Sequence, residues 1–224
     1  MITVNCAVRY RFAHIEEPVA AIRAVGPSVP GSSGGMPPSA PYFVAAGDLI
    51  GHALPPGLDF GVYDSNHTNP FADPARYDNV WGWNYYRARC PYDLYDEPTR
   101  AAYYAKFGGF TSPAGSCLDC RSASMDVPGT IAGAWYVEPT STGTSGPRLA
   151  AAADCDGTVR IGAPTVPMMI TSGPDPDTVT DEHCYSTADR YIYLKLIGAN
   201  LHEAHGDGPC PATFPTTNVT IFQR

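Results

Sequence analysis

The sequence predicts a mainly β protein made of two small units. Glycine and proline supply 22 and 23 of the 224 residues, and only 16% of the residues are charged. This balance disfavours long helices and favours short strands joined by turns. After residue 124, short apolar runs recur between Gly, Pro and Asp turns, a pattern typical of an antiparallel β-barrel or sandwich.

The first unit, residues 1–124, is expected to combine a small β core with an irregular aromatic and cysteine-containing extension. Residues 1–12 alternate like one strand, and residues 16–25 predict a short helix. The stretch 26–41, rich in small residues and proline, predicts an exposed loop. Because Met1 is followed directly by strand-like alternation, we expect the chain to begin inside a fold, either because a leader and upstream segment are missing or because the reading frame starts late.

The rest of this unit is predicted to be a hairpin, an irregular segment and a helix. Residues 46–51 and 58–63 are expected to pair as neighbouring strands across a Pro-Pro-Gly turn. Residues 64–83 show no clear period. Residues 97–107 predict a helix, with Pro98 in its first turn, where proline is tolerated.

The second unit, residues 125–224, is predicted to be an antiparallel β unit. The Asp154–Gly157 segment predicts a hairpin turn rather than a calcium loop, because the acidic residue that closes such a loop is absent. Residues 175–183 predict a solvated loop. Strands are expected at 133–137, 148–153, 158–161, 166–171, 190–196, 200–203 and 219–222.

Charge and motifs exclude several classes of function. The net charge of -8 gives no basic surface for nucleic acid, and no apolar run of 18 residues is present to span a membrane. Neither a Gly-x-Ser-x-Gly elbow nor a phosphate-binding glycine loop occurs. The partners expected are therefore a peptide or small-molecule substrate.

Seven cysteines predict disulfides and a secreted or periplasmic location, because such a number is unusual in a reducing compartment. Cys6 is the candidate for the unpaired thiol. Cys184 and Cys210 bracket a predicted hairpin and could clamp it. Cys117 and Cys120 have the spacing of half a zinc knuckle or a redox pair, although no second such pair follows. The disulfide candidates are Cys90, Cys117, Cys120, Cys184 and Cys210.

Three motifs within residues 8–63 carry a family resemblance. They are Tyr10-Arg-Phe-Ala-His14, the glycine turn Val44-Ala-Ala-Gly-Asp-Leu-Ile-Gly51, and Gly57-Leu-Asp-Phe-Gly-Val62. This segment resembles the lysostaphin and LytM family of zinc metallopeptidases, in which Tyr-x-His-Leu, Val-x-x-Gly-x-x-Ile-Gly and His-Leu-His-Phe-Glu-Val follow in that order. The resemblance implies a lysostaphin-like β core and a zinc-dependent hydrolase.

Carried over by position, the resemblance makes His14 the catalytic histidine beside the reacting carbonyl. Asp59 stands where the family has a zinc-ligand histidine, and Gly57 replaces a second catalytic histidine. A hydrolytic zinc takes three protein ligands and a water, and the family's other two ligands lie upstream of the matched segment. His67 is the nearby candidate to complete the metal site. Alternatively, Asp59 is a structural carboxylate paired with Arg9 or Arg11, and His14 is a structural histidine.

Aromatic residues offer a second kind of site. An aromatic cluster could line a cleft for sugar rings or a peptide, because aromatic faces provide broad contact at little entropic cost. Its members are Trp81, Trp83, Tyr85, Tyr86, Tyr92 and Tyr95. The alternative is that they fill the core of a leucine-poor fold.

Three functions follow from these observations. The first is a divergent extracytoplasmic peptidase-like protein, a metal-dependent hydrolase with a degenerate site. The second is a non-catalytic binding or structural module of the cell envelope. The third is a small-ligand carrier that uses the C-terminal β unit, whose opening Gly133-Ala-Trp135 is similar to a lipocalin Gly-x-Trp motif.

Overall fold

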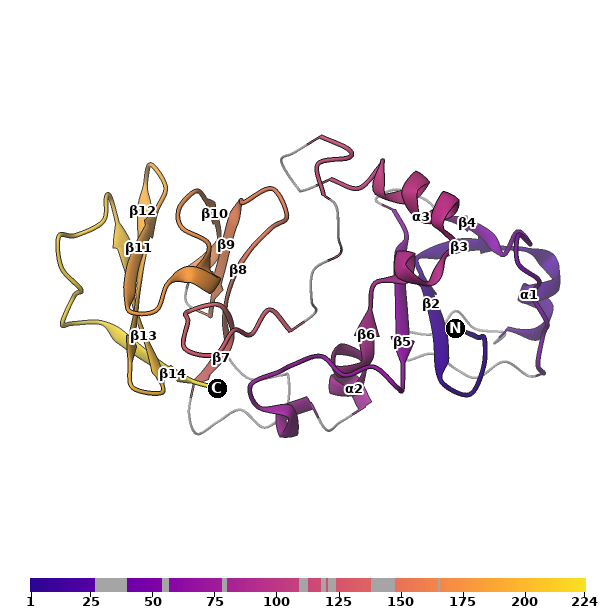
Figure 1. Cartoon of the computed structure of the whole chain (residues 1–224), viewed down its shortest axis with the longest axis horizontal. Helices are drawn as coiled ribbons and strands as arrows, with labels where there is room; N and C mark the ends of the chain where they lie inside the picture. Colours follow the sequence, from indigo (N-terminus) through magenta and orange to yellow (C-terminus); the bar gives the residue numbers. More distant parts are fainter. Residues whose placement is uncertain are drawn as a thin grey trace. The chain divides into compact units, whose positions relative to one another are not determined.

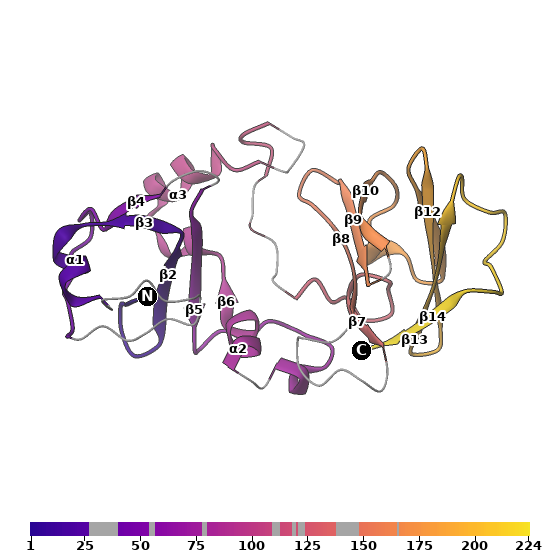
Figure 2. The same ribbon diagram turned by 180° about the vertical axis from the view of Figure 1, so that it is seen from behind.

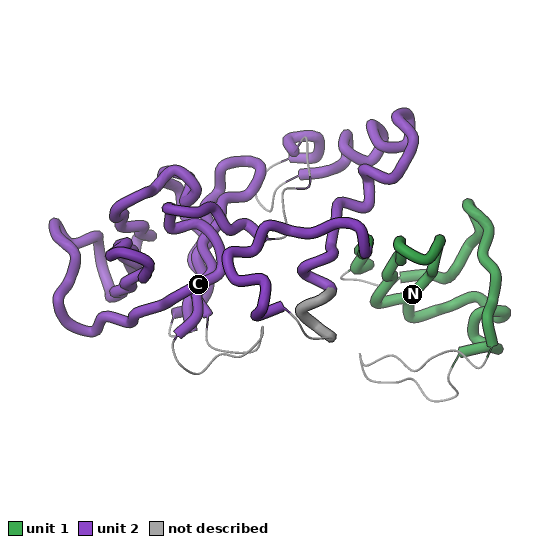
Figure 3. Tube along the Cα trace, turned by 60° about the horizontal axis from the view of Figure 1, so that its bottom comes forward, with its two compact units in different colours: residues 1–64 green, residues 65–224 purple. Residues whose placement is uncertain are grey.

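The computed structural model describes residues 1–26, 40–53, 57–77, 80–108, 113–117, 120, 124–137, 148–164 and 166–224, with the side chains of residues 80–83 left out. The chain divides into two compact units, residues 1–64 and residues 65–224 (Figure 3). The domain boundary predicted near residue 124 falls inside the second unit and stays a prediction. In the described residues, none of the helices has the length and apolar character needed to cross a membrane.

The first unit is built on strands that pair across long stretches of sequence. Strands β1 (Ile2–Thr3), β2 (Val8–Ala13) and β5 (Asp59–Asp64) lie in that order in one antiparallel sheet. Strands β3 (Ile15–Pro18) and β4 (Gly51–Ala53) form a separate antiparallel pair. The expected hairpin between residues 46–51 and 58–63 is therefore wrong, because β4 pairs with β3 while β5 pairs with β2.

Two further expectations for this unit need correction. The single strand expected at residues 1–12 is interrupted, because the Asn5 side chain accepts hydrogen bonds from the backbone N–H groups of Ala7 and Val8 and forms a turn. The helix expected at residues 16–25 begins late, since residues up to Pro18 belong to β3 and α1 spans only Ala20–Val25. The loop predicted at residues 26–41 lies largely outside the described residues.

The second unit opens with short helices. These are η1 (Pro74–Tyr77), α2 (Val80–Arg87), η2 (Pro91–Leu94) and α3 (Glu97–Tyr104), with the short strand β6 (Ala88–Arg89) after α2. The predicted helix at 97–107 is confirmed over its first eight residues, and its N-cap is Asp96, whose carboxylate accepts the Thr99 N–H. Helix α2 was not predicted, since Gly82 and Asn84 weaken its helical signal.

The rest of the unit is one antiparallel sheet of eight strands, ordered β10-β9-β8-β7-β14-β13-β12-β11. Figures 1 and 2 show the sheet curling back on itself. The Thr171 hydroxyl on β10 donates to the Ser186 carbonyl on β11 at 2.7 Å, so the two edge strands meet and the sheet is a nearly closed barrel. Its strands are β7 (Gly133–Val137), β8 (Arg148–Ala153), β9 (Val159–Ala163), β10 (Val166–Thr171), β11 (Glu182–Ser186), β12 (Arg190–Ile197), β13 (Asn200–Asp207) and β14 (Val219–Gln223).

The predicted fold class is confirmed, and so are the seven strands predicted for this unit. The hairpin turn at Asp154 is also confirmed, with Gly157 at φ +80° donating its N–H to the Asp154 carbonyl. The solvated loop expected up to residue 183 is wrong at its end, because Glu182 and His183 begin β11 and pair with Lys195 and Leu194.

Alternating side chains fill the barrel interior. Trp135, Leu149, Ile161, Leu194 and Phe222 are all essentially buried in one apolar cluster. On the outer side of β7, Tyr136 is buried as well, and its hydroxyl lies 2.9 Å from that of Tyr77 on η1. Tyr77 of η1 thus packs on the outer side of β7, while aliphatic and aromatic side chains fill the inside of the barrel.

Candidate functional site

His14 and Asp59 meet at the end of the β2–β5 pair. The antiparallel register sets Ala13 opposite Asp59, so His14 follows directly where the ladder ends. His14 Nε2 lies 3.4 Å from Asp59 Oδ2, and the two side chains are 64% and 69% exposed. The pair predicted from the motif resemblance is therefore brought together at the surface, and His14, rather than Arg9 or Arg11, is the ion-pair partner shown for Asp59.

The backbone at His14 is itself unusual, because its φ is +63°. Residues other than glycine adopt this left-handed conformation rarely, although histidine does so more often than most, and such conformations concentrate at functional sites. The conformation separates β2 from β3, which begins at Ile15. It thereby turns the chain at the position where the imidazole reaches Asp59.

The glycine turn of the second motif supports this site from the other side. Gly47 has φ +91°, which glycine adopts without steric cost. A Cβ on Gly51 would come within 2.6 Å of the Ile15 side chain and 2.7 Å of the Glu17 carbonyl oxygen. Glycine is therefore required at Gly51 for β4 to lie against β3, directly after His14.

A zinc ion is the cofactor implied by the resemblance. The resemblance assigns Asp59 to the metal and His14 to catalysis. Within the described ranges of the chain, no three His, Cys, Asp or Glu residues are grouped closely enough to hold a metal ion. Asp59 alone is fewer ligands than a hydrolytic zinc site needs.

His67, the candidate third ligand, belongs to the second unit. Its Nε2 lies 3.3 Å from Asn69 Oδ1. Asn69 is buried, and its amide nitrogen donates to the carbonyls of Tyr85 and Ala88 at 2.8 and 2.7 Å. The contact shown for the His67 ring is therefore with a residue that holds the segment after α2 in place, which is a structural role.

Only some of the side chains predicted to form the aromatic site belong to the described part of the structure. The side chains of Trp81 and Trp83 lie outside the described part of the structure. Tyr85 on α2 is 48% exposed. Two further members of the predicted cluster, Tyr92 and Tyr95, stack with Tyr103 of α3 at ring-centroid distances of 5.0 and 5.3 Å. Tyr103 itself was not predicted, because in the sequence it belongs to a helical segment apart from the cluster.

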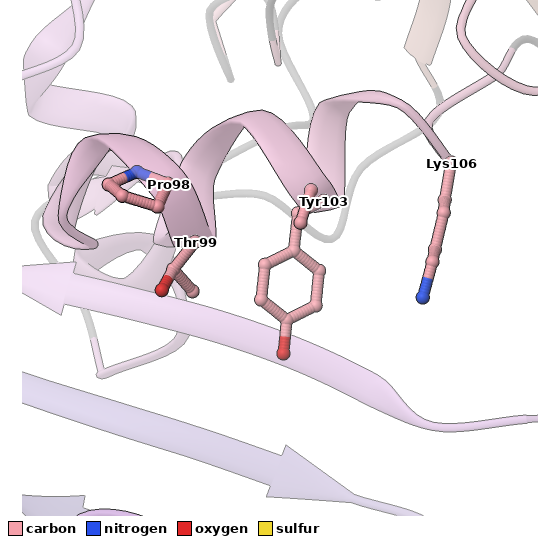
Figure 4. Close-up of a pocket in the computed structure, with 5 residues that line it drawn as sticks. Pro98, Thr99, Tyr103 and Lys106 are labelled. Carbon is pink, nitrogen blue, oxygen red and sulfur yellow. The ribbon is translucent and has the colours of Figure 1, made fainter.

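A surface cavity of about 410 Å³ lies along the face of α3 that carries Tyr103. Its lining residues are Pro98, Thr99, Ala102, Tyr103 and Lys106. In Figure 4, Thr99, Tyr103 and Lys106 project from the same side of the helix. The spacing of Thr99, Tyr103 and Lys106 by four and three residues could have indicated this face.

The barrel contains a buried acidic group. Glu203 on β13 is 0% exposed, and its Oε1 lies 2.8 Å from His205 Nδ1. Its Oε2 is buried without a hydrogen-bond partner in the described structure. Burial raises the pKa of the Glu203 carboxyl, and the hydrogen bond and charge of His205 oppose that rise only in part.

Two further polar side chains share the inner face with Glu203. His183, Leu194, Glu203 and Thr220 lie opposite one another in the strand register and therefore point to the same side of the sheet. Burial lowers the pKa of His183, whose ring packs edge-on against Tyr185. The sequence showed only that Glu203 and His205 are two residues apart on a strand.

All five predicted disulfide cysteines are paired. The bonds are Cys90–Cys120, Cys117–Cys155 and Cys184–Cys210, and the remaining thiol, at Cys6, is exposed. The predicted clamp between Cys184 and Cys210 is confirmed. Cys117 and Cys120 each bond to a distant cysteine, so neither half of a zinc knuckle nor a redox pair is present at this position.

Comparison with known proteins found no match: no family model, no curated protein and no solved structure is significantly similar to this chain.

Proposed function

We propose that this chain is a divergent peptidase-like protein of an extracytoplasmic compartment, and that it engages a peptide or amide substrate at His14 and Asp59. The observation that carries the proposal is the approach of His14 Nε2 to Asp59 Oδ2 at 3.4 Å. These residues are 45 positions apart in the sequence and occupy the two motif positions that the lysostaphin-type resemblance assigns to one site.

The chemistry proposed for the pair is proton handling at a substrate carbonyl. With Nε2 directed at the carboxylate, the tautomer that carries its proton on Nε2 is favoured, which leaves Nδ1 free to accept a proton or a hydrogen bond. Asp59 thus orients the ring, and His14 is the group that faces the substrate. Both side chains are exposed, so a peptide can reach them without a change in the fold.

Zinc would supply an activated water and a Lewis acid for the carbonyl, if it were bound. Asp59 would contribute a carboxylate oxygen, which suits zinc. Because one ligand does not complete a hydrolytic site, no step is assigned to the metal. The essential element of the proposal is the His14–Asp59 pair.

The compartment is inferred from the cysteines. Three disulfides, one of which joins segments 38 residues apart, are typical of proteins in an oxidising environment. We therefore propose a secreted or periplasmic location.

A second candidate function is a binding module of the cell envelope that has lost catalysis. It is favoured by the replacement of two motif histidines by Gly57 and Asp59. In that case the same surface binds a peptide and releases it unchanged. The carrier function proposed for the C-terminal unit finds less support, because the apolar side chains of the barrel pack against one another in its interior.

One experiment separates these candidates. The purified chain is incubated with a set of internally quenched peptides, with and without added zinc, and cleavage and binding are both measured. For a hydrolase, His14→Ala and Asp59→Asn should each lower cleavage by about 100-fold or more, which is the usual contribution of a positioned acid or base. His52→Ala, which removes an exposed histidine from β4 of the same unit, is the matched control.

The outcomes are distinct. Binding that depends on His14 and Asp59 without cleavage would establish the binding module. If the wild-type chain neither binds nor cleaves peptides, or if both variants behave like His52→Ala, the proposed site is wrong.

A further inference from the structure

The exposed face of α3 has the features of a ligand site that is independent of His14 and Asp59. Thr99, Ala102, Tyr103 and Lys106 repeat at intervals that align side chains along one side of a helix, and they line the cavity of about 410 Å³ (Figure 4). This volume lies within the range of about 300 to 1,000 Å³ usual for small-molecule sites.

The helix that carries this face is firmly held. Asp96 caps its first turn by accepting the Thr99 N–H. Hydrogen bonding by the Thr99 side chain, and then by its backbone N–H, lowers the pKa of the Asp96 carboxyl. On the opposite side, the Tyr104 hydroxyl lies 3.3 Å from Cys90 Sγ and 3.2 Å from Asp93 Oδ1. Cys90 is itself fixed by its disulfide to Cys120. The site is therefore largely ordered before any ligand arrives.

Tyr103 is the aromatic centre of the face. Its ring stacks with those of Tyr92 and Tyr95, with ring centroids within 5.3 Å of both, yet the residue remains 42% exposed. The two neighbouring rings hold Tyr103 in place, and the exposed part of its ring gives an apolar surface against which a sugar ring can pack. Tyrosine also presents a hydroxyl that exchanges hydrogen bonds with sugar hydroxyls.

Lys106 supplies the charge that selects the ligand. It lies one helical turn beyond Tyr103, is exposed, and its ammonium forms no ion pair with a carboxylate of the described residues. By contrast, Arg100 on α3 is paired with Glu97. An ammonium that pairs with no carboxylate of the described residues, beside an aromatic side chain, complements a ring that bears a carboxylate.

We propose that this face binds a saccharide that carries a carboxylate, of the uronic-acid type. The sugar ring packs on the exposed part of the Tyr103 ring, and its carboxylate pairs with Lys106. Its hydroxyls form hydrogen bonds with the hydroxyls of Thr99 and Tyr103. The net charge of the chain is -8, so general attraction cannot account for the binding of an anionic sugar. Binding of such a ligand must therefore depend on the local contact with Lys106.

The test uses a trimer of galacturonic acid and, as its neutral partner, the same trimer with methyl-esterified carboxyls. Binding to the full chain is measured by calorimetry and by NMR shifts of the α3 amides. The acidic trimer should bind up to about fivefold more tightly than the ester, and Lys106→Gln should abolish that preference, since an exposed ion pair contributes about that much at most. Tyr103→Ala should weaken both ligands.

Tyr85→Ala removes an exposed tyrosine from α2 and should leave both affinities unchanged, as should His14→Ala. The His14→Ala variant separates this proposal from the peptidase-like function, because only that function uses His14. Circular dichroism checks that each variant is folded. Failure of the acidic trimer to bind, equal binding of the two trimers, or full binding by Lys106→Gln would each overturn the proposal.

Discussion

Glu203 shows how a single residue can make the stability of the barrel depend on pH. Its carboxyl is fully buried, with one oxygen on His205 and the other without a partner in the described structure. Burial raises its pKa above the unfolded value of about 4.5. Between these two pKa values the folded state holds more protons than the unfolded chain, so the free energy of unfolding falls as pH rises through that window.

Glu203→Gln should therefore make the free energy of unfolding less dependent on pH between the unfolded and folded pKa values of Glu203. At higher pH the variant should be more stable than the wild type. The amide keeps an oxygen for His205 and removes the buried charge. Denaturant unfolding at a series of pH values from 4 to 8 measures the effect. Glu182→Gln is the control with the opposite sign, because the hydrogen bond from Lys195 lowers the pKa of Glu182, and its stabilisation is lost as pH falls. Identical profiles for Glu203→Gln and the wild type would contradict the assignment.

At the scale of elements, Gly51 joins β4 to β3 beside His14. The side chain of an alanine there would overlap with Ile15 and with the Glu17 carbonyl, both of which belong to β3. We expect Gly51→Ala to separate β3 from β4 and to lower the midpoint of thermal unfolding of the first unit by several degrees, since strain of this kind commonly costs about 1 to 3 kcal/mol.

The measurement is hydrogen exchange of the amides of β3 and β4 together with thermal unfolding. Gly162→Ala on β9 is the control, because a Cβ at Gly162 meets no atom within 4 Å. Unchanged protection of β3 and β4 in Gly51→Ala would show that the close approach is relieved at little cost.

At the scale of the whole second unit, the disulfide between Cys117 and Cys155 connects the segment after α3 to the turn between β8 and β9. It closes a loop of 38 residues, for which the chain-entropy model gives about 4 kcal/mol of stabilisation. The double variant Cys117→Ala/Cys155→Ala should lower the free energy of unfolding by up to that amount. Urea unfolding measures the loss, and Cys6→Ser, which changes the exposed thiol, should have little effect.

Other contacts tie the same unit together through its buried polar groups. The carboxylate of Asp126 accepts the N–H groups of Ala72 and Ala134 at 2.9 and 2.8 Å, which links the helical segment to β7. At the C-terminus, Arg224 packs its guanidinium over Trp135 at 3.9 Å and donates to the carbonyls of Val127 and Thr130. Residues from three distant parts of the chain thus meet around β7.

The sequence by itself determined the class of fold and the strands of the barrel. Alternation of apolar residues between glycine, proline and aspartate turns is a local property, so β7, β8, β12 and the Asp154–Gly157 turn could be predicted from neighbouring residues alone. The clamp between Cys184 and Cys210 followed in the same way, because its cysteines bracket one hairpin.

Only the tertiary structure decided which strands pair across long intervals, because local patterns do not specify distant partners. It joined β4 to β3 instead of β5, and it brought Ala13 opposite Asp59. Burial is equally a property of the whole fold: Glu203 resembles any other glutamate in the sequence, and it becomes a buried acid because the closing barrel turns its strand face inward. For the same reason Tyr103 and Lys106 became visible as one surface only when α3 was placed beside Tyr92 and Tyr95.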